Sequence, residues 1–328
     1  MTTLARLKTS ASAVGRFAVG SVMGVALVAA LAAAPAKAFA QVAVAEAPAA
    51  AAAPATVLPA SGAGPALWVV KDADSTLYLF GTVHVLKPTT AWGSAKVDAA
   101  FNAASDIYFE ISNPDDQAAM VPLIQQYGVS PQTPLSSLLT PAEIADLDAA
   151  AKTIGASAAK LDVFRPWLAG LSLSMAPLVK AGYDPASGVE LIFKSRAQAA
   201  GKPIHGFETI DEQVRVLATL PEEAQLEFLR STLESFDSAA TELDTLVEAW
   251  AAGDTATLQK VGVDEMKTEA PAIYDALLTR RNAGFADDIQ GLLAGSGVAF
   301  IAVGAAHLVG PDSVQAMLET RGVTVEQQ

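Results

Sequence analysis

Two histidines that follow hydrophobic segments are the first candidates for chemistry in this sequence. The pattern Gly-x-x-His occurs after an apolar run at residues 81–84, ending in His84, and again at residues 304–307, ending in His307. A glycine lets the backbone turn sharply where a strand ends, so each imidazole could point back over a sheet. Two imidazoles that face one crevice suit a divalent metal ion. The alternative is that each histidine only forms hydrogen bonds within a loop, and both interpretations stay open here.

Carboxylates follow two other segments of β-type composition. Glu110 ends the run 107–109, and Glu208 ends the run 204–207. Each could reach the same crevice, where a carboxylate could bind metal or act as a general base toward a metal-bound water. The alternatives are a helix cap or a surface acid for Glu110, and a helix cap for Glu208. Glu190, near an expected helix start, is a weaker candidate.

Two further polar positions have a less direct link to chemistry. His205 and Glu208 form a His-x-x-Glu pair, but His205 lies inside an expected strand, so we expect a structural histidine. Arg281, followed by Asn282, lies late in an expected helix. An arginine that reaches an acidic crevice would balance its charge and bind a carboxylate or an oxyanion. The alternative is a solvated arginine near a helix C-terminus.

Composition excludes several classes of site and partner. The 328 residues include no cysteine, which excludes disulfides, thiolate metal sites and cysteine nucleophiles. The sequence has no His-Glu-x-x-His, Gly-x-Ser-x-Gly, Walker A or Gly-x-Gly-x-x-Gly motif. The net charge of −14 makes a nucleic-acid partner unfavourable, so we expect none.

The elements that must position these residues follow an α/β order. Apolar, β-branched runs alternate with long stretches of helical spacing, which favours a central, mainly parallel sheet with a large helical insertion. In such a sheet, residues just beyond the carboxyl ends of the strands converge on one crevice. We expect strands at 67–71, 76–81, 107–111, 203–207, 298–303 and 323–325, helices at 94–104 and 311–320, and helical stretches over 115–200 and 211–292.

The N-terminal part reads as an export signal and a linker. Residues 1–40 have a basic start, an apolar run and small residues before Ala40, which predicts a signal peptide cleaved after Ala40. An uncleaved anchor is the alternative, because the apolar run reaches the lower limit for crossing a bilayer. Residues 41–66 are rich in alanine and proline and predict a disordered linker. We therefore expect a periplasmic or secreted domain over 67–328 with no stable membrane span after cleavage.

Several segments together resemble one known family. The segments LYLFGTVHVLK, GVELIFKSRAQAAGKPIHGFETIDEQ and FIAVGAAHLVGPDSV, with Glu110 and the pair Arg281 and Asn282, resemble the TraB/GumN family, whose animal relatives are the Tiki metalloproteases. The resemblance implies an α/β fold with paired Gly-x-x-His motifs and a metal-dependent hydrolase site. It implies that His84 and His307 are metal ligands or catalytic histidines. By the same resemblance, Glu110 and Glu208 are metal ligands or bases, and Arg281 and Asn282 contact the substrate or an oxyanion.

These observations lead to one functional expectation and two alternatives. We expect an exported metal-dependent hydrolase, most simply a peptidase, that binds Mn²⁺, Co²⁺ or Zn²⁺ and acts on a peptide or another small molecule. One alternative is a non-catalytic binding protein for peptide, haem or metal. The other is an assembly partner for envelope or polysaccharide complexes. The sequence gives no oligomeric state.

Overall fold

The computed structural model describes residues 57–328. The predicted signal peptide and residues 41–56 of the predicted linker lie outside the described residues. Within the described part, no helix is both long enough and apolar enough to cross a bilayer.

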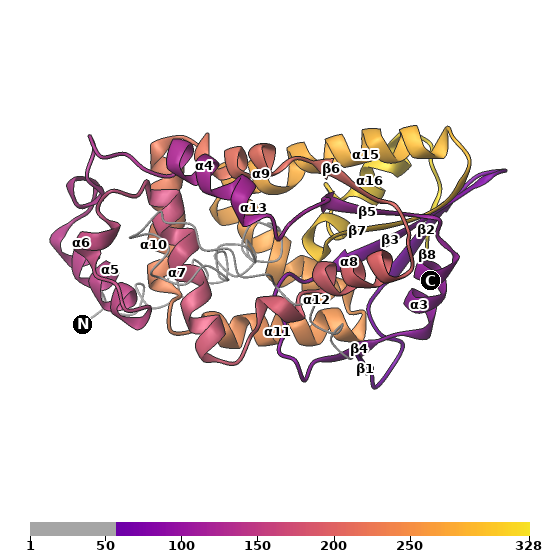
Figure 1. Cartoon of the computed structure of the whole chain (residues 1–328), viewed down its shortest axis with the longest axis horizontal. Helices are drawn as coiled ribbons and strands as arrows, with labels where there is room; N and C mark the ends of the chain where they lie inside the picture. Colours follow the sequence, from indigo (N-terminus) through magenta and orange to yellow (C-terminus); the bar gives the residue numbers. More distant parts are fainter. Residues whose placement is uncertain (1–56) are drawn as a thin grey trace, which may run out of the picture.

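A six-stranded mixed sheet forms the centre of the fold (Figure 1). Its strand order is β6-β5-β7-β3-β2-β8, in which the first four strands are parallel and the last two pairings are antiparallel. This confirms the expected α/β class with a mostly parallel sheet. The strands are β2 (Leu67–Lys71), β3 (Ser75–Thr82), β5 (Asp106–Ile111), β6 (Ile204–Glu208), β7 (Gly297–Gly304) and β8 (Val325–Gln327).

The register of β3 and β7 brings the two Gly-x-x-His segments together. The two strands run parallel, and Thr82 pairs with Gly304 at their carboxyl ends. The strands therefore finish level, and the segments that carry His84 and His307 leave the same edge of the sheet. β5 lies beside β7, so Glu110 near its end belongs to the same edge.

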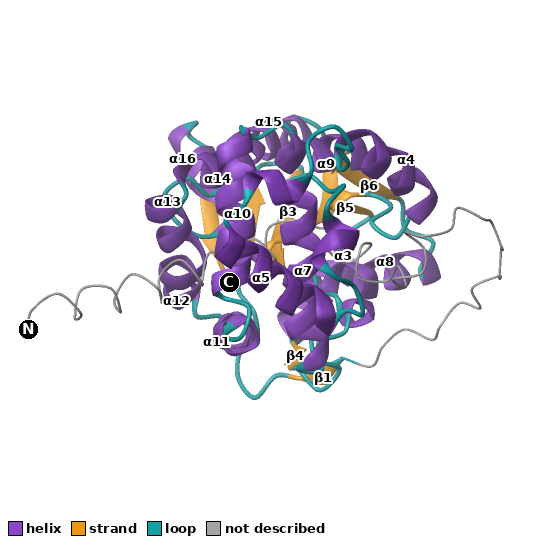
Figure 2. Ribbon diagram, turned by 90° about the vertical axis from the view of Figure 1, so that its left-hand side faces the viewer, coloured by secondary structure: helices purple, strands orange, loops and turns teal. Residues whose placement is uncertain are grey.

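Helices cover both faces of this sheet, as the view in Figure 2 shows. On one face, Phe80 and Phe300 pack against Phe193 of α8 (Val189–Ala199), and Phe300 also packs against Phe101 of α3 (Ala95–Ala103), with ring centroids 5.0–5.6 Å apart. The other face is covered by α15 (Arg280–Leu293) and α16 (Val314–Thr320). There Phe285, Ala286 and Ile289 of α15 and Val314 and Leu318 of α16 join the core that contains Leu79 and Ile301.

Most of the other helices come from the two long connections that enter and leave β6. Figure 1 shows α5, α6, α7 and α10 gathered at the end of the molecule that the strands' carboxyl ends face. The helices between β3 and β6 are α3 (Ala95–Ala103), α4 (Gln117–Tyr127), α5 (Pro141–Thr153), α6 (Ala158–Leu161), α7 (Pro166–Lys180) and α8 (Val189–Ala199), with 3₁₀ turns Leu135–Leu138 and Pro185–Ser187. Those after β6 are α9 (Ile210–Ala218), α10 (Glu222–Glu234), α11 (Ala239–Ala252), α12 (Thr255–Thr257), α13 (Glu265–Glu269), α14 (Pro271–Tyr274), α15 (Arg280–Leu293) and α16 (Val314–Thr320), with π-helical segments η3 (Leu258–Asp264) and η4 (Asp275–Thr279) and the 3₁₀ turn Ala305–Leu308.

Local sequence signals explain where several of these helices begin. Pro141 and Pro166 occupy the first turns of α5 and α7, where a missing backbone N–H costs nothing. Thr209 caps α9 through a reciprocal pair of hydrogen bonds with Glu212. Glu208 therefore does not cap this helix, and its carboxylate is available for other contacts.

The fold differs from the sequence expectation at its beginning. A short parallel sheet joins β1 (Leu58–Pro59) to β4 (Ala91–Gly93), so part of the segment expected to be a linker is folded. Ala60 N donates to Gly93 O at 2.9 Å. Neither strand has an alternating pattern, which is why the sequence did not indicate them.

The backbone turn that carries His84 is fastened to the start of α8. Val189 N donates to Val83 O at 3.0 Å, and Asp184 N donates to Leu86 O at 2.9 Å. Gly188 lies between these contacts, and a Cβ atom at this position would lie 2.3 Å from His84 O. Only a residue without a side chain allows this approach.

Gly188→Ala should therefore lower the free energy of unfolding by about 1–3 kcal/mol, the usual cost of an overpacked interior. Gly284→Ala is the matched control: a Cβ atom there meets open space within α15. The control should raise stability by up to about 1 kcal/mol, because alanine favours a helix over glycine. Urea unfolding of the three proteins measures both effects. Equal stability of Gly188→Ala and the wild type would contradict the close approach.

Candidate functional site

The guanidinium of Arg281 lies between two carboxylates at the carboxyl edge of the sheet. Its Nη2 donates to Glu110 Oε2 at 2.6 Å and to Glu208 Oε2 at 2.7 Å, and its Nε donates to Glu208 Oε1 at 2.7 Å. Arg281 and Glu110 are buried, and Glu208 is nearly so. Burial of a lone charge would be costly, and the pairing removes most of that cost. The arginine thus joins β5, β6 and α15.

Gln213 of α9 completes the polar shell around the two glutamates. Its Nε2 donates to Glu110 Oε2 and to Glu208 Oε2, both at 3.0 Å. The side chain is 1% exposed, and its Oε1 is buried without a hydrogen-bond partner among the described residues. A buried acceptor of this kind is uncommon and leaves room for a donor from water or a ligand.

Glu110 is held in its ionised form by its surroundings. Burial alone would raise its pKa, but Arg281, His307, His84 and the backbone N–H of Gly304 outweigh burial and lower the pKa to about 2. The Gly304 N–H donates to Glu110 Oε1 at 2.7 Å. The glycine that begins the second Gly-x-x-His segment therefore also anchors the carboxylate.

His307 is fully buried and engaged on both ring nitrogens. Its Nδ1 lies 2.5 Å from Asn282 Oδ1, and its Nε2 lies 3.1 Å from Arg281 Nη1. Since an amide oxygen can only accept and a guanidinium can only donate, the neutral ring carries its proton on Nδ1. Asn282 is itself fixed, because its Nδ2 donates to Asp312 O at 2.7 Å. His307 is thereby locked in one orientation.

His84 has a different environment from that of His307. Its Nδ1 lies 2.7 Å from Glu190 Oε1, and the Thr82 hydroxyl donates to the same carboxylate oxygen. The ring is 2% exposed, and its Nε2 has no hydrogen-bond partner among the described residues. Burial alone would lower the pKa of His84, but Glu190 outweighs burial and raises the pKa above its ordinary value of 6.5. His84 is therefore a carboxylate-oriented imidazole with one free nitrogen.

Both histidines interact electrostatically with Glu110. His307 and His84 each lower the pKa of Glu110, and Glu110 and Arg281 both shift the pKa of His84. His307 Nε2 lies 3.5 Å from Glu110 Oε1, and the level ends of β3 and β7 bring the His84 segment to the same edge of the sheet. The expected convergence of strand ends is thus realised in the fold, with His84 at the side of α8 and His307 at the side of α15.

The helix that supplies Arg281 and Asn282 begins with irregular backbone. The π-helical segment η4 (Asp275–Thr279) runs directly into α15, and Arg281 Nη1 donates to Leu277 O at 3.2 Å within it. A π-helical turn changes the angular position of the residues that follow. Here it precedes the two residues of α15 that form hydrogen bonds with His307.

The described residues do not include a group of three or more histidine or acidic side chains arranged to hold a metal ion. The donor chemistry suits a metal, because both imidazoles turn Nδ1 to an acceptor and so present Nε2 as the lone pair. Their placement does not suit one, because Arg281 occupies Glu110, Glu208 and His307 Nε2. The predicted metal ligands therefore stay a prediction.

The structure brings together the candidate residues His84, Glu110, Glu208, Arg281, Asn282 and His307. Glu190, the weaker candidate, is the partner of His84. His205 lies apart: it pairs with Asp106 at 3.0 Å and stacks on Tyr108, as expected of a structural histidine. Two further residues of the site, Gln213 and Thr82, were not predicted from the sequence. The position of Thr82, two residues before His84, was the one sequence signal for Thr82. Gln213 belongs to no motif and had no such signal.

Comparison with known proteins identifies the family. Residues 66–327 match the TraB/PrgY/gumN family. The chain belongs to this family. It is 23% identical over 267 residues to an uncharacterized protein of Treponema pallidum, covering 77% of this chain and 80% of that protein. It is also 22% identical over 256 residues to the uncharacterized proteins YbaP of Escherichia coli and Shigella flexneri, covering 77% of this chain and 92% of each. No solved structure matches the chain.

Removal of the arginine from this TraB/PrgY/gumN protein should destabilise it strongly. Arg281→Leu leaves Glu110 and Glu208 buried without their counterion, which should lower the free energy of unfolding by about 3–5 kcal/mol. Arg280→Leu is the control, because Arg280 is exposed and, within the described residues, pairs with Asp275 at the surface. It should change stability by less than about 1 kcal/mol. Chemical denaturation of both variants measures the difference, and equal losses would refute the central role of Arg281.

Stability should also depend on acid through Glu110. Its pKa is about 2 in the folded protein and near 4.5 as the ordinary value, so the unfolded chain takes up this proton first as the pH falls. The stabilisation from the ionised group is complete above about pH 5 and is lost progressively from pH 4.5 toward pH 2.

The advantage of the wild type over Glu110→Gln should therefore shrink across that range. Denaturation curves at several pH values measure it. Glu319→Gln, at an exposed position of α16, is the control and should show no such trend. A constant difference between the wild type and Glu110→Gln would mean that the carboxylate is not ionised in the folded state.

Proposed function

We propose that this protein is a hydrolase that activates water with His84 and cleaves amide bonds of peptides. The observation that supports it most is the buried His84 ring, with Nδ1 held by Glu190 and Nε2 without a partner in the described part of the chain. An oriented imidazole with one free nitrogen is the arrangement of a general base. The raised pKa makes the neutral ring a stronger base than an ordinary imidazole.

The proposed reaction needs no covalent intermediate with the protein. The chain has no cysteine, and no hydroxyl of the described residues contacts His84 Nε2. In this scheme His84 Nε2 takes a proton from water as the water oxygen attacks the carbonyl carbon. The protonated ring then gives that proton to the leaving amine as the carbon–nitrogen bond breaks. Glu190 stabilises the positive ring between the two steps.

The remaining residues have positioning roles in this proposal. Arg281 uses its N–H groups on Glu110, Glu208, Leu277 O and His307, so it holds the framework of the site. Asn282 fixes the ring of His307. Gln213 has a buried free Oε1, which could accept a hydrogen bond from the substrate or from the attacking water.

A metal-dependent version of the reaction is the second candidate. It is favoured by the tautomers of His84 and His307, which both present Nε2 as a lone pair. A metal ion would supply a polarised water when bound. It would require Arg281 to release the carboxylates of Glu110 and Glu208, so we derive no step through it. Mn²⁺, Co²⁺ and Zn²⁺ remain the predicted ions, and export to the periplasm or the medium remains part of the proposal.

Hydrolysis of a quenched fluorescent peptide library tests the proposal. His84→Ala should lower the rate by about 10²–10⁴-fold, the usual contribution of a general base. His205→Ala is the matched control, because this histidine is partly exposed and its partners among residues 57–328 are Asp106 and the Tyr108 ring. It should retain activity within a factor of about two, since surface substitutions have small effects.

The pH profile and metal dependence separate the two versions. The rate should fall as the pH drops through the pKa of His84, which lies above 6.5. Because the Glu190 carboxylate raises this pKa, Glu190→Gln should move the acidic fall in rate to lower pH. Activity that survives a chelator supports the metal-free version, and activity that needs Mn²⁺, Co²⁺ or Zn²⁺ supports the metal-dependent one. Equal rates for the wild type and His84→Ala would overturn both. Binding without cleavage would instead favour a binding protein, and a Soret band would indicate haem.

A further inference from the structure

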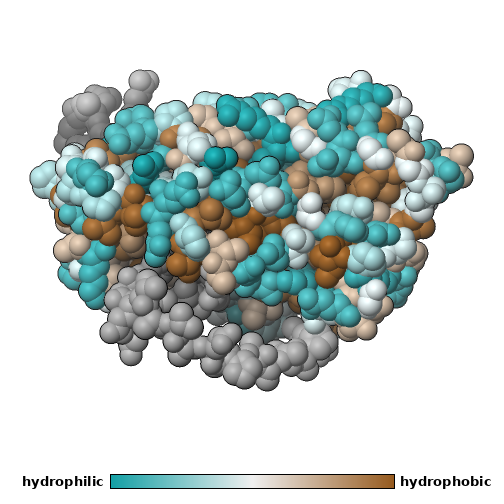
Figure 3. Space-filling model, turned by 45° about the horizontal axis from the view of Figure 1, so that its top comes forward, coloured by the Kyte–Doolittle hydropathy of each residue, from teal (hydrophilic) through white to brown (hydrophobic). Residues whose placement is uncertain are grey.

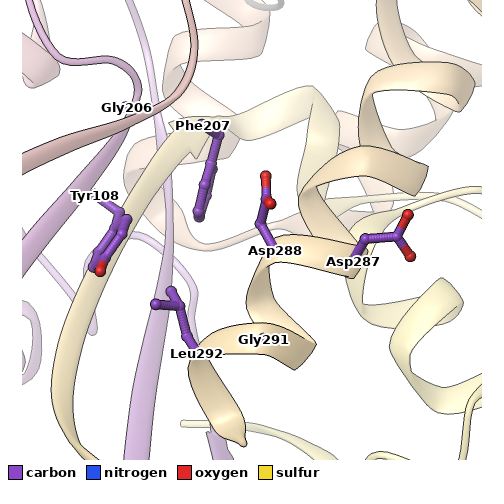
Figure 4. Close-up of a pocket in the computed structure, with 7 residues that line it drawn as sticks. All are labelled: Tyr108, Gly206, Phe207, Asp287, Asp288, Gly291 and Leu292. Carbon is purple, nitrogen blue, oxygen red and sulfur yellow. The ribbon is translucent and has the colours of Figure 1, made fainter. Parts of the chain in front are cut away.

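A cavity of about 310 Å³ lies beside β6, away from His84, and none of the site residues described above lines it. Figure 4 shows its lining, which comes from two strands and one helix. Tyr108 of β5 and Phe207 of β6 form an aromatic wall, with ring centroids 5.6 Å apart in a stacked arrangement. Leu292 of α15 adds an apolar side chain, and Asp287 and Asp288 of α15 add two carboxylates.

The two carboxylates of this cavity differ in their partners. Asp287 pairs with Arg321 at 2.7 Å, and in Figure 4 its side chain points away from the aromatic rings. Asp288 has no ion-pair partner among residues 57–328, and its carboxylate points toward the side of Phe207 in the same view. Burial, Asp287 and Glu208 raise the pKa of Asp288, which is the effect of a carboxylate without a cation. The cavity therefore has an uncompensated negative charge.

An aromatic wall next to a free carboxylate suits one class of ligand. Cations are attracted to the faces of tyrosine and phenylalanine rings, and a carboxylate adds a charged hydrogen bond. The apolar part of the wall suits the aliphatic stem of a long basic side chain. Lysine and arginine side chains combine all three features.

The cavity also lies along an edge of the sheet. β6 is the last strand on its side, and within the described residues no further strand pairs with it. A free edge offers backbone N–H and C=O groups to an extended peptide, which adds to the sheet as another strand. Figure 3 shows a mostly hydrophilic face of the molecule with hydrophobic side chains visible between the polar ones.

One stripe of α15 links this cavity to the Arg281 network. Arg281, Phe285, Asp288 and Leu292 follow one another at the spacing of a single helical face. At 1.5 Å per residue, Asp288 lies about 10 Å along the helix axis from Arg281. An extended peptide covers this distance with about three residues. β6 itself runs from the cavity to Glu208, which Arg281 binds.

We infer that the cavity binds the lysine or arginine side chain of an extended peptide that pairs with the edge of β6, about three residues from the Arg281 network. The inference rests on the proposed peptide hydrolysis for its biological meaning. The binding itself does not depend on catalysis. The peptide backbone pairs with β6, its basic group meets Asp288, and its stem lies against Tyr108 and Phe207.

Binding of acetylated, amidated heptapeptides tests this inference directly. The probe contains alternating valine and threonine with one central arginine, and its control replaces that arginine by neutral citrulline. Asp288 is exposed, so the arginine peptide should bind the wild type about fivefold more tightly, as expected for a charged contact at the protein surface. Asp288→Asn should reduce this preference to less than about twofold. Asp287→Asn, the matched control next to it, should keep the preference because Asp287 is already paired with Arg321.

Two results would overturn the inference. One is equal binding of the arginine and citrulline peptides by the wild type, and the other is an unchanged preference in Asp288→Asn. A third probe, in which alternate backbone amides are methylated, should bind at least about tenfold more weakly, and equal binding would overturn the pairing with β6. Calorimetry reads binding without cleavage. If the cavity does not bind basic side chains, these affinities will show it. If the protein binds the peptides but is not a hydrolase, the peptides will bind without being cleaved.

Discussion

The buried guanidinium of Arg281 is the constraint on which the rest of the site depends. A charge this deep in the protein must be compensated by close partners, and the chain supplies Glu110 from β5 and Glu208 from β6, to which Gln213 of α9 also donates. None of these residues is near Arg281 in the sequence. The network is therefore complete only when two strands and two helices have reached their final positions, and it couples the geometry of the site to folding. Because Glu110 also accepts from Gly304 N, the same network fixes the end of β7.

This constraint separates the roles of two histidines that look equivalent in the sequence. His307 lies against Arg281, and its two ring nitrogens are both occupied, so its orientation is part of the framework. His84 lies toward α8, where Glu190 and Thr82 hold one side of the ring and leave Nε2 free. A repeated motif has thus produced one locked imidazole and one open imidazole. The difference comes from the helices that each face of the sheet carries, since α15 contributes an arginine and α8 a glutamate.

Much of this arrangement could be predicted from the sequence because it depends on strand ends. Apolar runs that end at a glycine predicted β3 and β7. Two further β-type runs that end at a glutamate predicted β5 and β6, with Glu110 and Glu208 at their ends. The role of Gln213 could not be predicted, because a glutamine inside an amphipathic helix has no local signature and gains its partners from tertiary packing. The π-helical turn before Arg281 was also invisible, since its residues suit an ordinary helix equally well. The contact between the His84 segment and α8 depends on Gly188, which leaves room for His84 O. In the sequence this glycine indicates only the start of a helix.

Because β6 lies at the edge of the sheet, it contributes both to the buried network and to the exposed surface. Its carboxyl end supplies Glu208 to the buried network, while its outer edge and the neighbouring Tyr108 and Phe207 remain partly exposed. A central strand could not do both, because a neighbour would cover its backbone. Helix α15 runs in the opposite direction and changes along its length from Arg281, which pairs with two acids, to Asp288, which faces open space. The acids near this helix therefore have a cation in the interior and none at the edge. A positively charged group from outside the chain would therefore be attracted most strongly to the end of α15 that carries Asp288.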